Sequence, residues 1–325
     1  MTASSREPLL VLEGLSKVFT RRWLGRGREL TAVRDLSLTV YRGDLFGFLG
    51  PNGAGKSTTL RMALGLIHPT AGRVLIAGHD LAAERLAALR QVGAFVEAPS
   101  FYGYLSGRKN LEIFAGLSGG VAAAEIDAVL ERVGLRGREL DPVSVYSHGM
   151  RQRLGIAACL LPKPGLLILD EPTDGLDPHG IRDVRELLVS LVRDDGLTVF
   201  LSSHLLSEVE HLCNRIAILE QGELILQGEL SELEREHRGL SLSVDRPAEA
   251  AALLRERCGV QAEAHPPPRE GVRIRPGSAD PAVLNRALLE AGFRVAALEP
   301  EPHWLDRLFL ERTTTREAAP AGARP

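Results

Sequence analysis

The sequence predicts an α/β fold in which a mostly parallel sheet carries a phosphate-binding loop, with an inserted helical subdomain and a small α+β domain after it. Three observations predict this fold. A short apolar run leads into a glycine-rich turn and then a helical pattern, and a second apolar run ends in two acidic residues. Beyond about residue 234 the composition shifts toward Arg, Ala and Pro, and the patterns follow the order β-α-β-β-α-β of a ferredoxin-like domain.

Length and charge limit the classes of function. The 325 residues are enough for one large domain and one smaller domain, each with its own core. A formal net charge of -3 argues against a general nucleic-acid binder. No apolar run approaches the roughly 18 residues that a membrane-spanning helix needs. We therefore expect a soluble chain that does not bind nucleic acid.

Two strands are expected ahead of the phosphate loop. Residues 9–12 are apolar, and apolar residues alternate with polar ones over residues 36–40, so together they predict an antiparallel edge. Phe19 lies between them. Its ring could stack on a nucleotide base, and packing in the core is the alternative.

The phosphate-binding loop follows the predicted buried strand Leu45–Leu49. It matches the motif G-x-x-x-x-G-K-[ST], with Gly50, Gly55, Lys56 and Ser57 in the fixed positions. Glycines let backbone N–H groups approach phosphate oxygens, and the N-terminus of the next helix adds partial positive charge. We expect Lys56 to neutralise the β- and γ-phosphates and the Ser57 hydroxyl to bind Mg²⁺.

The apolar run Leu166–Leu169 predicts a central parallel strand that delivers two acids to the same site. We expect Asp170 to hold Mg²⁺ through its water shell and Glu171 to polarise the attacking water. The alternative is that both acids only cap the next helix. His204 follows the predicted strand at residues 197–201, where it can reach the γ-phosphate from the same sheet edge.

Residues 98–160 have helical patterns and predict a helical subdomain inserted into the sheet domain. Within it, the stretch YSHGMRQ precedes a helix and places Ser147 as a helix-start hydroxyl and Gly149 as a bare backbone donor. This is a second phosphate-binding surface, which one ATP does not need from the same chain. We therefore expect Ser147 and Gly149 to bind the ATP held by another copy.

At these residues the chain resembles the ATP-binding subunits of ABC transporters, over about residues 9–234. GPNGAGKST is similar to the Walker A motif, YSHGM to the signature motif, LLILDEP to Walker B, GLD to the D-loop, and Ser203-His204 to the switch histidine. Five motifs in the family's order and spacing are highly specific together. The resemblance implies an ATPase and adds four nucleotide-binding candidates within the Walker A and D-loop motifs: Asn52, Gly53, Thr58 and Asp177.

Within that family, the stretches FVEAPSFYGYLSGRKNL, YSHGMRQRLGIA and DEPTDGLDPHGI are most similar to exporters of drugs, bacitracin and lantibiotics. This implies a motor that dimerises head to tail around two ATP molecules, with Mg²⁺ as cofactor. It implies a separate ABC-2-type membrane permease as partner, with the chain peripheral to the cytoplasmic face of the cell membrane. Residues 99–110, with three aromatic side chains, are the implied contact with the permease, and packing inside the subdomain is the alternative.

Two positions depart from the family's usual pattern. In the signature, usually LSGGQ, Tyr146, His148 and Met150 differ, whereas the serine and the second glycine remain. Glu97 stands where the Q-loop usually has glutamine. A carboxylate there can still reach Mg²⁺ or the attacking water, so Glu97 is also a candidate metal ligand.

Two other classes of function stay open. One is a soluble ABC ATPase that acts on ribosomes or DNA, and the other is a regulatory module that holds ATP and hardly hydrolyses it. The expected organisation is an ATP-binding domain over residues 1–234, an α+β accessory domain over residues 235–312 and a disordered tail over residues 313–325.

Overall fold

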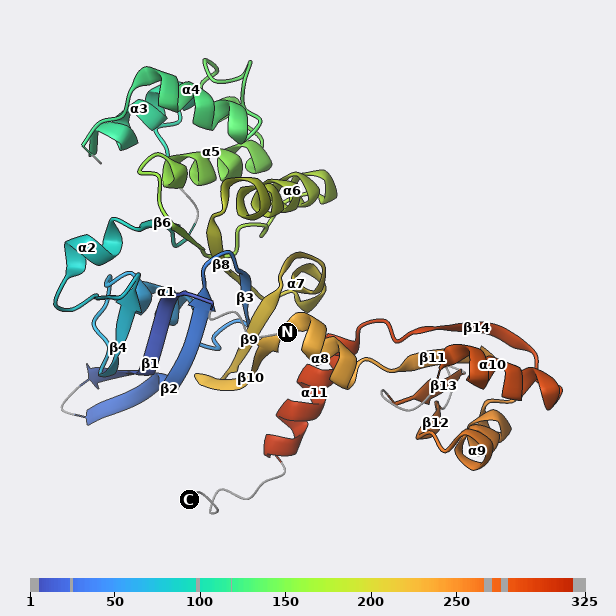
Figure 1. Cartoon of the computed structure of the whole chain (residues 1–325). Helices are drawn as coiled ribbons and strands as arrows, with labels where there is room; N and C mark the ends of the chain where they lie inside the picture. The colour runs from blue at the N-terminus through green and yellow to red at the C-terminus, as the bar shows by residue number, and fades with distance from the viewer. Residues whose placement is uncertain are drawn as a thin grey trace. The chain divides into compact units, whose positions relative to one another are not determined.

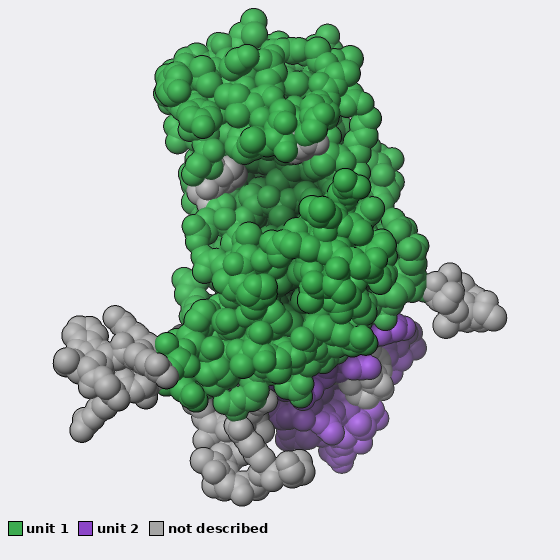
Figure 2. Space-filling model, turned by 90° about the vertical axis from the view of Figure 1, so that its left-hand side faces the viewer, with its two compact units in different colours: residues 1–227 green, residues 228–325 purple. Residues whose placement is uncertain are grey.

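The computed structural model describes residues 6–23, 26–97, 100–117, 119–265, 271–275 and 280–317 (Figure 1). Contacts divide the chain into two compact units, residues 1–227 and residues 228–325, which Figure 2 shows in different colours. The expected boundary at residue 234 falls inside helix α8 (Leu230–His237), which belongs to the second unit. Among the described residues, every helix is too short or too polar to span a membrane.

The first unit is built on a six-stranded sheet with the strand order β10-β9-β3-β8-β7-β6. Strand β3 pairs in parallel with β8 and β9, and β7 pairs in parallel with β8 and β6. The predicted mostly parallel sheet is therefore confirmed. Strands β3, β7 and β8 are buried at every residue, as their apolar sequences require. The strands are β3 (Leu45–Leu49), β6 (Val92–Phe95), β7 (Leu166–Leu169), β8 (Thr198–Ser203), β9 (Arg215–Glu220) and β10 (Glu223–Glu229).

A second, four-stranded sheet has the order β2-β1-β4-β5. Its first two strands pair antiparallel over nearly their whole length, with several register shifts. They are longer than the sequence predicts because these bulges interrupt the alternation of apolar and polar residues. The strands are β1 (Pro8–Trp23), β2 (Arg26–Tyr41), β4 (Ala71–Ile76) and β5 (His79–Asp80).

Both sheets of the first unit contribute to one apolar core, in which the rings of Phe46 and Phe48 stack on that of Phe200. Helices α3, α4 and α5 form the helical subdomain, grouped together in Figure 1, and α5 also packs on α6 and β6. The helices are α1 (Lys56–Ala63), α2 (Arg85–Leu89), α3 (Gly107–Leu117), α4 (Ala123–Arg132), α5 (His148–Leu160), α6 (Pro178–Asp195) and α7 (Leu206–Leu212), with a 3-10 turn at Val143–Val145.

The second unit contains an antiparallel sheet in the order β12-β13-β11-β14, against which α9 and α10 pack. This order is consistent with the ferredoxin-like arrangement expected from the sequence. Helix α11 continues to Glu317, so the expected tail begins inside a helix, and residues 318–325 lie outside the described residues. The elements are β11 (Leu240–Val244), α9 (Pro247–Cys258), β12 (Ala262–His265), β13 (Gly271–Ile274), α10 (Pro281–Glu290), β14 (Val295–Pro300) and α11 (Trp304–Glu317).

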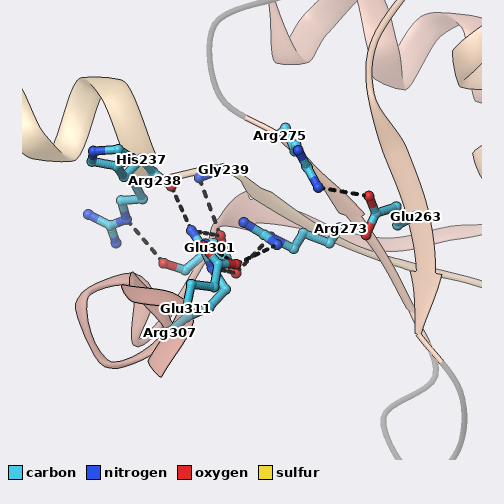
Figure 3. A network of polar contacts seen from close by, with 9 residues as sticks. All are labelled: His237, Arg238, Gly239, Glu263, Arg273, Arg275, Glu301, Arg307 and Glu311. Carbon is cyan, nitrogen blue, oxygen red and sulfur yellow. Dashed lines mark hydrogen bonds and ion pairs between the residues drawn. The ribbon is translucent and has the colours of Figure 1, made fainter. Parts of the chain in front are cut away.

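A polar network joins these elements around the Glu301 carboxylate (Figure 3). Arg307 Nε donates to Glu301 Oε1 at 2.9 Å, and Arg273 Nε lies 3.1 Å from the same oxygen as an ion pair. Arg307 also donates to the His237 carbonyl at 2.7 Å. The network therefore ties α11 to β13 and to the end of α8.

Candidate functional site

The carboxyl ends of four parallel strands meet at one edge of the six-stranded sheet. Leu49, the last residue of β3, pairs with Ser203 at the end of β8, and Leu169, the last residue of β7, pairs with Phe95 at the end of β6. The residues that follow these strands are the phosphate loop, His204, Asp170 and the segment of Glu97. The topology thus brings to one edge the motifs that the sequence predicts to act together.

The backbone of the phosphate loop requires glycine at two positions. Gly50 has φ 156° and Gly55 has φ 108°. A Cβ on Gly50 would lie 2.2 Å from the Leu219 carbonyl oxygen, and one on Gly55 would lie 2.5 Å from the Ala32 carbonyl oxygen. Gly55 is also the N-cap of α1 and provides no side-chain cap, so the N–H groups of that helix end are available to an anion.

Lys56 lies folded back over this loop. Its side chain is only 6% exposed, and its ammonium donates to the carbonyls of Gly50 at 2.7 Å and Pro51 at 3.3 Å. Lys56 Nζ also lies 3.3 Å from Glu171 Oε1. A buried cation beside a glycine cradle fits the phosphate chain of a nucleotide.

The two acids after β7 are held by Ser202. Its hydroxyl donates to Asp170 Oδ1 and accepts from the Glu171 backbone N–H at 3.0 Å. Glu171 has φ 48°, a left-handed conformation that is unusual for glutamate. Its Oε2 lies 2.9 Å from His204 Nδ1 and 3.3 Å from the His204 backbone nitrogen. The Glu171 carboxylate therefore lies between Lys56 and His204.

The candidate Mg²⁺ ligands are Ser57, in the first turn of α1, and the buried Asp170. Within the described ranges, no group of three or more His, Cys, Asp or Glu side chains could hold a metal ion. This is compatible with Mg²⁺, which is commonly held by one or two protein oxygens together with phosphates and waters. Glu97 has a side chain that is 71% exposed, and it forms an ion pair with Arg61 of α1.

The signature segment begins helix α5. Ser147 is the N-cap, and its hydroxyl accepts from the Met150 backbone N–H at 3.2 Å. Tyr146, one of the departures from the usual signature, is buried, and its hydroxyl donates to the Arg138 carbonyl at 2.7 Å. Burial raises the pKa of Tyr146. This departure therefore affects packing within the subdomain and leaves Ser147 exposed.

The D-loop segment lies beside the signature segment. A Cβ on Gly175 would approach the ring of His148 to 3.5 Å, and one on Gly149 would approach the Gly180 Cα to 3.6 Å. Asp177 is the N-cap of α6 and accepts from the Gly180 backbone N–H at 2.7 Å. The side chain of Asp177 thus has a structural partner within its own chain.

The base-stacking candidate lies on β1. Phe19 is 41% exposed, and the Lys17 ammonium lies 5.1 Å from the centre of its ring. The ring is therefore not part of the buried core.

Three buried polar residues near the site were not singled out in the sequence. Ser202 positions both acids, and Thr173 Oγ1 donates to Glu208 Oε2 at 2.6 Å. The sequence offers a weak signal for Glu208, because it lies four residues after His204, in the helix that follows. For Ser202 and Thr173 the sequence offers only their proximity to the recognised motifs.

Comparison with known proteins identifies the family. The sequence profile of the ABC transporter family matches residues 33–174. An uncharacterized ABC transporter ATP-binding protein of Bacillus subtilis, YhcH, is 51% identical over 232 residues, which cover 71% of this chain and 75% of that protein. The chain belongs to the ABC transporter ATP-binding proteins. Its predicted fold class, its ATPase class and its resemblance to this family are therefore confirmed.

Two further relatives of this ABC protein carry the name of a transported compound. The bacitracin transport ATP-binding protein BcrA of Bacillus licheniformis is 39% identical over 283 residues, 86% of this chain and 92% of that protein. The lantibiotic transport ATP-binding protein SrtF of Streptococcus pyogenes is 38% identical over 221 residues, 68% of this chain and 91% of that protein. These relatives favour the ATP-binding subunit of a transporter over a soluble ABC ATPase.

Two solved structures of ABC proteins have the same fold. An ATP-binding subunit of an ABC transporter has a TM-score of 0.58 and 30% identity, covering 70% of this chain and 92% of that one. A dimeric ATP-binding cassette in a post-hydrolysis state, bound to ADP and Pi, has a TM-score of 0.60 and 24% identity. The match covers 68% of this chain and 99% of that one.

Proposed function

We propose that this ABC ATP-binding protein uses Glu171 as the general base of ATP hydrolysis and drives the export of a drug, an antibiotic peptide or a similar amphipathic compound. One observation carries the catalytic part, and the relatives named for bacitracin and lantibiotic transport support the export part. The Glu171 carboxylate lies 3.3 Å from the Lys56 ammonium and 2.9 Å from His204 Nδ1, at the sheet edge where the phosphate loop begins. A base, a cation and an orienting imidazole are the groups that attack of water on a phosphoryl group needs.

Each side chain then has a separate role. Glu171 accepts the proton of the attacking water, and His204 orients that carboxylate and reaches the γ-phosphate. Lys56 exchanges its carbonyl partners for phosphate oxygens, which are stronger acceptors because they are charged. Ser57 and Asp170 would hold Mg²⁺, which supplies positive charge to the phosphates when it is bound. Glu97 would reach this ion only after leaving Arg61.

We also propose a head-to-tail dimer in which Ser147, Gly149 and Asp177 of one copy contact the ATP of the other. Ser147 is the N-cap of α5 and Gly149 lies in its first turn, where backbone N–H groups lack partners in the helix. Ser147 is exposed, as contact with another copy requires. A dimer is also the state of the cassette of similar fold bound to ADP and Pi.

The permease partner is proposed from an exposed aromatic pair in the helical subdomain. Tyr102 is 51% exposed and Tyr104 is 78% exposed, and their rings lie 6.1 Å apart. Phe101 instead packs edge-on against Phe114 at 5.7 Å. Large aromatic side chains in solvent suit a protein contact. We propose that an ABC-2-type permease binds here, which would place the chain on the cytoplasmic face of the membrane.

The test of the catalytic role is the Glu171→Gln variant, with Glu186→Gln as its control. Glu186 is an exposed carboxylate of α6 paired with Arg182. We expect Glu171→Gln to bind ATP normally and to release phosphate at least about 100-fold more slowly, because the base is lost. The control should keep the original rate. Wild-type turnover in Glu171→Gln would overturn the proposal.

The same variant tests the partner. Tagged Glu171→Gln, purified from its host in mild detergent with Mg-ATP, should retain bound ATP and the closed dimer. A polytopic membrane protein recovered with it would support the transporter role. Ribosomes or DNA recovered in its place would contradict that role and favour the soluble ATPase.

A further inference from the structure

We propose that Glu208 is a positioning residue for ATP hydrolysis, because its buried carboxylate holds the loop after Glu171 against the helix after His204. The proposal rests on the role proposed above for Glu171. It assigns a task in the reaction to Thr173 and Glu208, which lie outside the five motifs.

The contact between these residues is short and shielded from water. Thr173 Oγ1 donates to Glu208 Oε2 at 2.6 Å, and the two residues are only 8% and 6% exposed. The second oxygen of the carboxylate, Oε1, lies 3.8 Å from Arg185 Nη2. Arg185 belongs to α6, the helix that Asp177 begins, so three segments of the site meet at one carboxylate.

The chemistry of this contact indicates a purpose other than stability. A buried carboxylate loses its hydration, and a neutral hydroxyl with a guanidinium beyond hydrogen-bond distance replaces that hydration only in part. Apolar side chains of similar size would stabilise such a position at least as well. A charged group kept there favours one specific arrangement of the neighbouring segments.

The Glu208 carboxylate favours the arrangement of the two segments that orients the proposed base, Glu171. His204 and Glu208 lie four residues apart on one segment, and Glu171 and Thr173 lie two residues apart on the other. Glu171 contacts His204 at 2.9 Å and Thr173 contacts Glu208 at 2.6 Å. Ser202 also bonds Asp170 and the Glu171 backbone N–H, so the Thr173–Glu208 contact is the one that joins the two segments beyond Glu171. Ser202 and His204 hold the backbone nitrogen and the carboxylate of Glu171, and the Thr173–Glu208 contact holds the chain on the other side of its left-handed turn.

The central test is a kinetic comparison of substitutions at Thr173. Thr173→Val removes the hydroxyl and keeps the shape, and Thr173→Ser keeps the hydroxyl. We expect Thr173→Val to lower kcat about tenfold and to leave KM for ATP within about twofold, because the phosphate loop is untouched. Thr173→Ser should have the wild-type kcat. Ser190→Ala, which removes a hydroxyl bonded to the Leu187 carbonyl of α6, is the control with wild-type kcat.

Pairwise coupling gives the second readout. Glu208→Gln should also lower kcat, and Thr173→Val combined with Glu208→Gln should cost less than the product of the two single effects, because both act through one contact. The rate is expressed per ATP-binding site, counted by bound nucleotide, so that a loss of folded protein does not count as a loss of kcat.

The outcomes separate the two proposals. If Glu171→Gln is inactive while Thr173→Val keeps wild-type kcat, the positioning role is wrong and the role of Glu171 stands. If Thr173→Val only lowers the melting temperature and the number of binding sites, the contact serves folding, and the positioning role is again wrong. If Glu171→Gln hydrolyses ATP normally, the proposed base itself is wrong.

Discussion

Lys56 contributes to the shape of its own loop as well as to the charge of the site. Its ammonium bonds the carbonyls of Gly50 and Pro51, the first two residues of the turn, while its side chain is almost fully buried. A substitution at Lys56 would therefore remove two hydrogen bonds that hold the turn, together with the proposed phosphate ligand. In such a variant, a loss of ATP affinity would have to be separated from a change in the shape of the turn without nucleotide.

At the same scale, the lowered pKa of His237 predicts that the second unit loses stability at acidic pH. Burial and the nearby Arg312 and Arg307 lower its pKa below the ordinary value of 6.5, against the opposing Glu236 carboxylate, which lies 3.9 Å away and is mostly exposed. The unfolded chain then binds the proton more tightly than the folded one. The contribution of neutral His237 to folding stability is therefore present above pH about 6.5 and is lost as the pH falls below that value.

The measurement is the melting temperature of the protein between pH about 8 and about 5.5, for the wild type and for His237→Gln. We expect the variant to lose less stability on acidification. Equal pH dependence in both proteins would show that His237 does not contribute.

Individual site residues were predictable where a motif fixes their spacing. Gly50, Lys56 and Glu171 lie together at the sheet edge as the sequence predicts, although their roles stay predictions. Thr173 and Glu208 could not be found in this way, because they are 35 residues apart in the sequence. They come into contact because they follow β7 and β8, which are neighbouring strands. The ion pair of Glu97 with Arg61 was also unexpected, because charge pairing on a surface leaves no pattern in the sequence.

At the scale of elements, the Glu301 network shows how a carboxylate can join helices to a sheet. Arg273 and Arg307 are 12% and 21% exposed, and Glu301 lies within 3.1 Å of both. We expect Glu301→Gln to destabilise the second unit by about 1–3 kcal/mol, because it removes the charge that both guanidinium groups share. Glu263→Gln, which breaks an exposed pair with Arg275, should change stability by less than about 1 kcal/mol.

Urea unfolding followed by tryptophan fluorescence can measure this difference. The chain has two tryptophans, and Trp304 is fully buried in the second unit. In a Trp23→Phe background, the fluorescence change reports the surroundings of Trp304. Equal midpoints for the Glu301 and Glu263 variants would contradict the prediction.

Elements with a strong period or a clear start were predicted well, and short ones were not. Helix α5 begins after its Ser147 cap as expected, and the turn at Gln221 and Gly222 joins β9 to β10. Helices α7 and α8, of seven and eight residues, were not predicted from the sequence. The pattern of residues 81–90 predicts an amphipathic helix, whereas α2 covers only Arg85–Leu89, because Asp80 accepts from the Ala82 N–H and forms a turn before it.

At the scale of the whole molecule, the two units have separate cores. The cluster of the first unit includes no residue beyond Leu224, and that of the second unit begins at Leu240. A chain ending at Glu229 would therefore keep the first core complete. We expect this fragment to fold and to bind ATP with unchanged affinity, measured by calorimetry beside the full chain. A fragment that is unfolded or that fails to bind ATP would contradict this expectation.

The left-handed backbone of Glu171 allows selection for stability to be distinguished from selection for activity at this position. Glu171 has a left-handed backbone, in which a residue with a Cβ is less stable than glycine by about 1 kcal/mol. In helices and strands the preference is reversed, and glycine is the more destabilising residue. Of two variants that both lack the carboxylate, Glu171→Gly should therefore withstand more urea than Glu171→Ala. The opposite order would mean that the turn relaxes once the carboxylate is gone. With the expected order, folding alone would favour glycine, and the glutamate would persist because selection on turnover outweighs selection on stability.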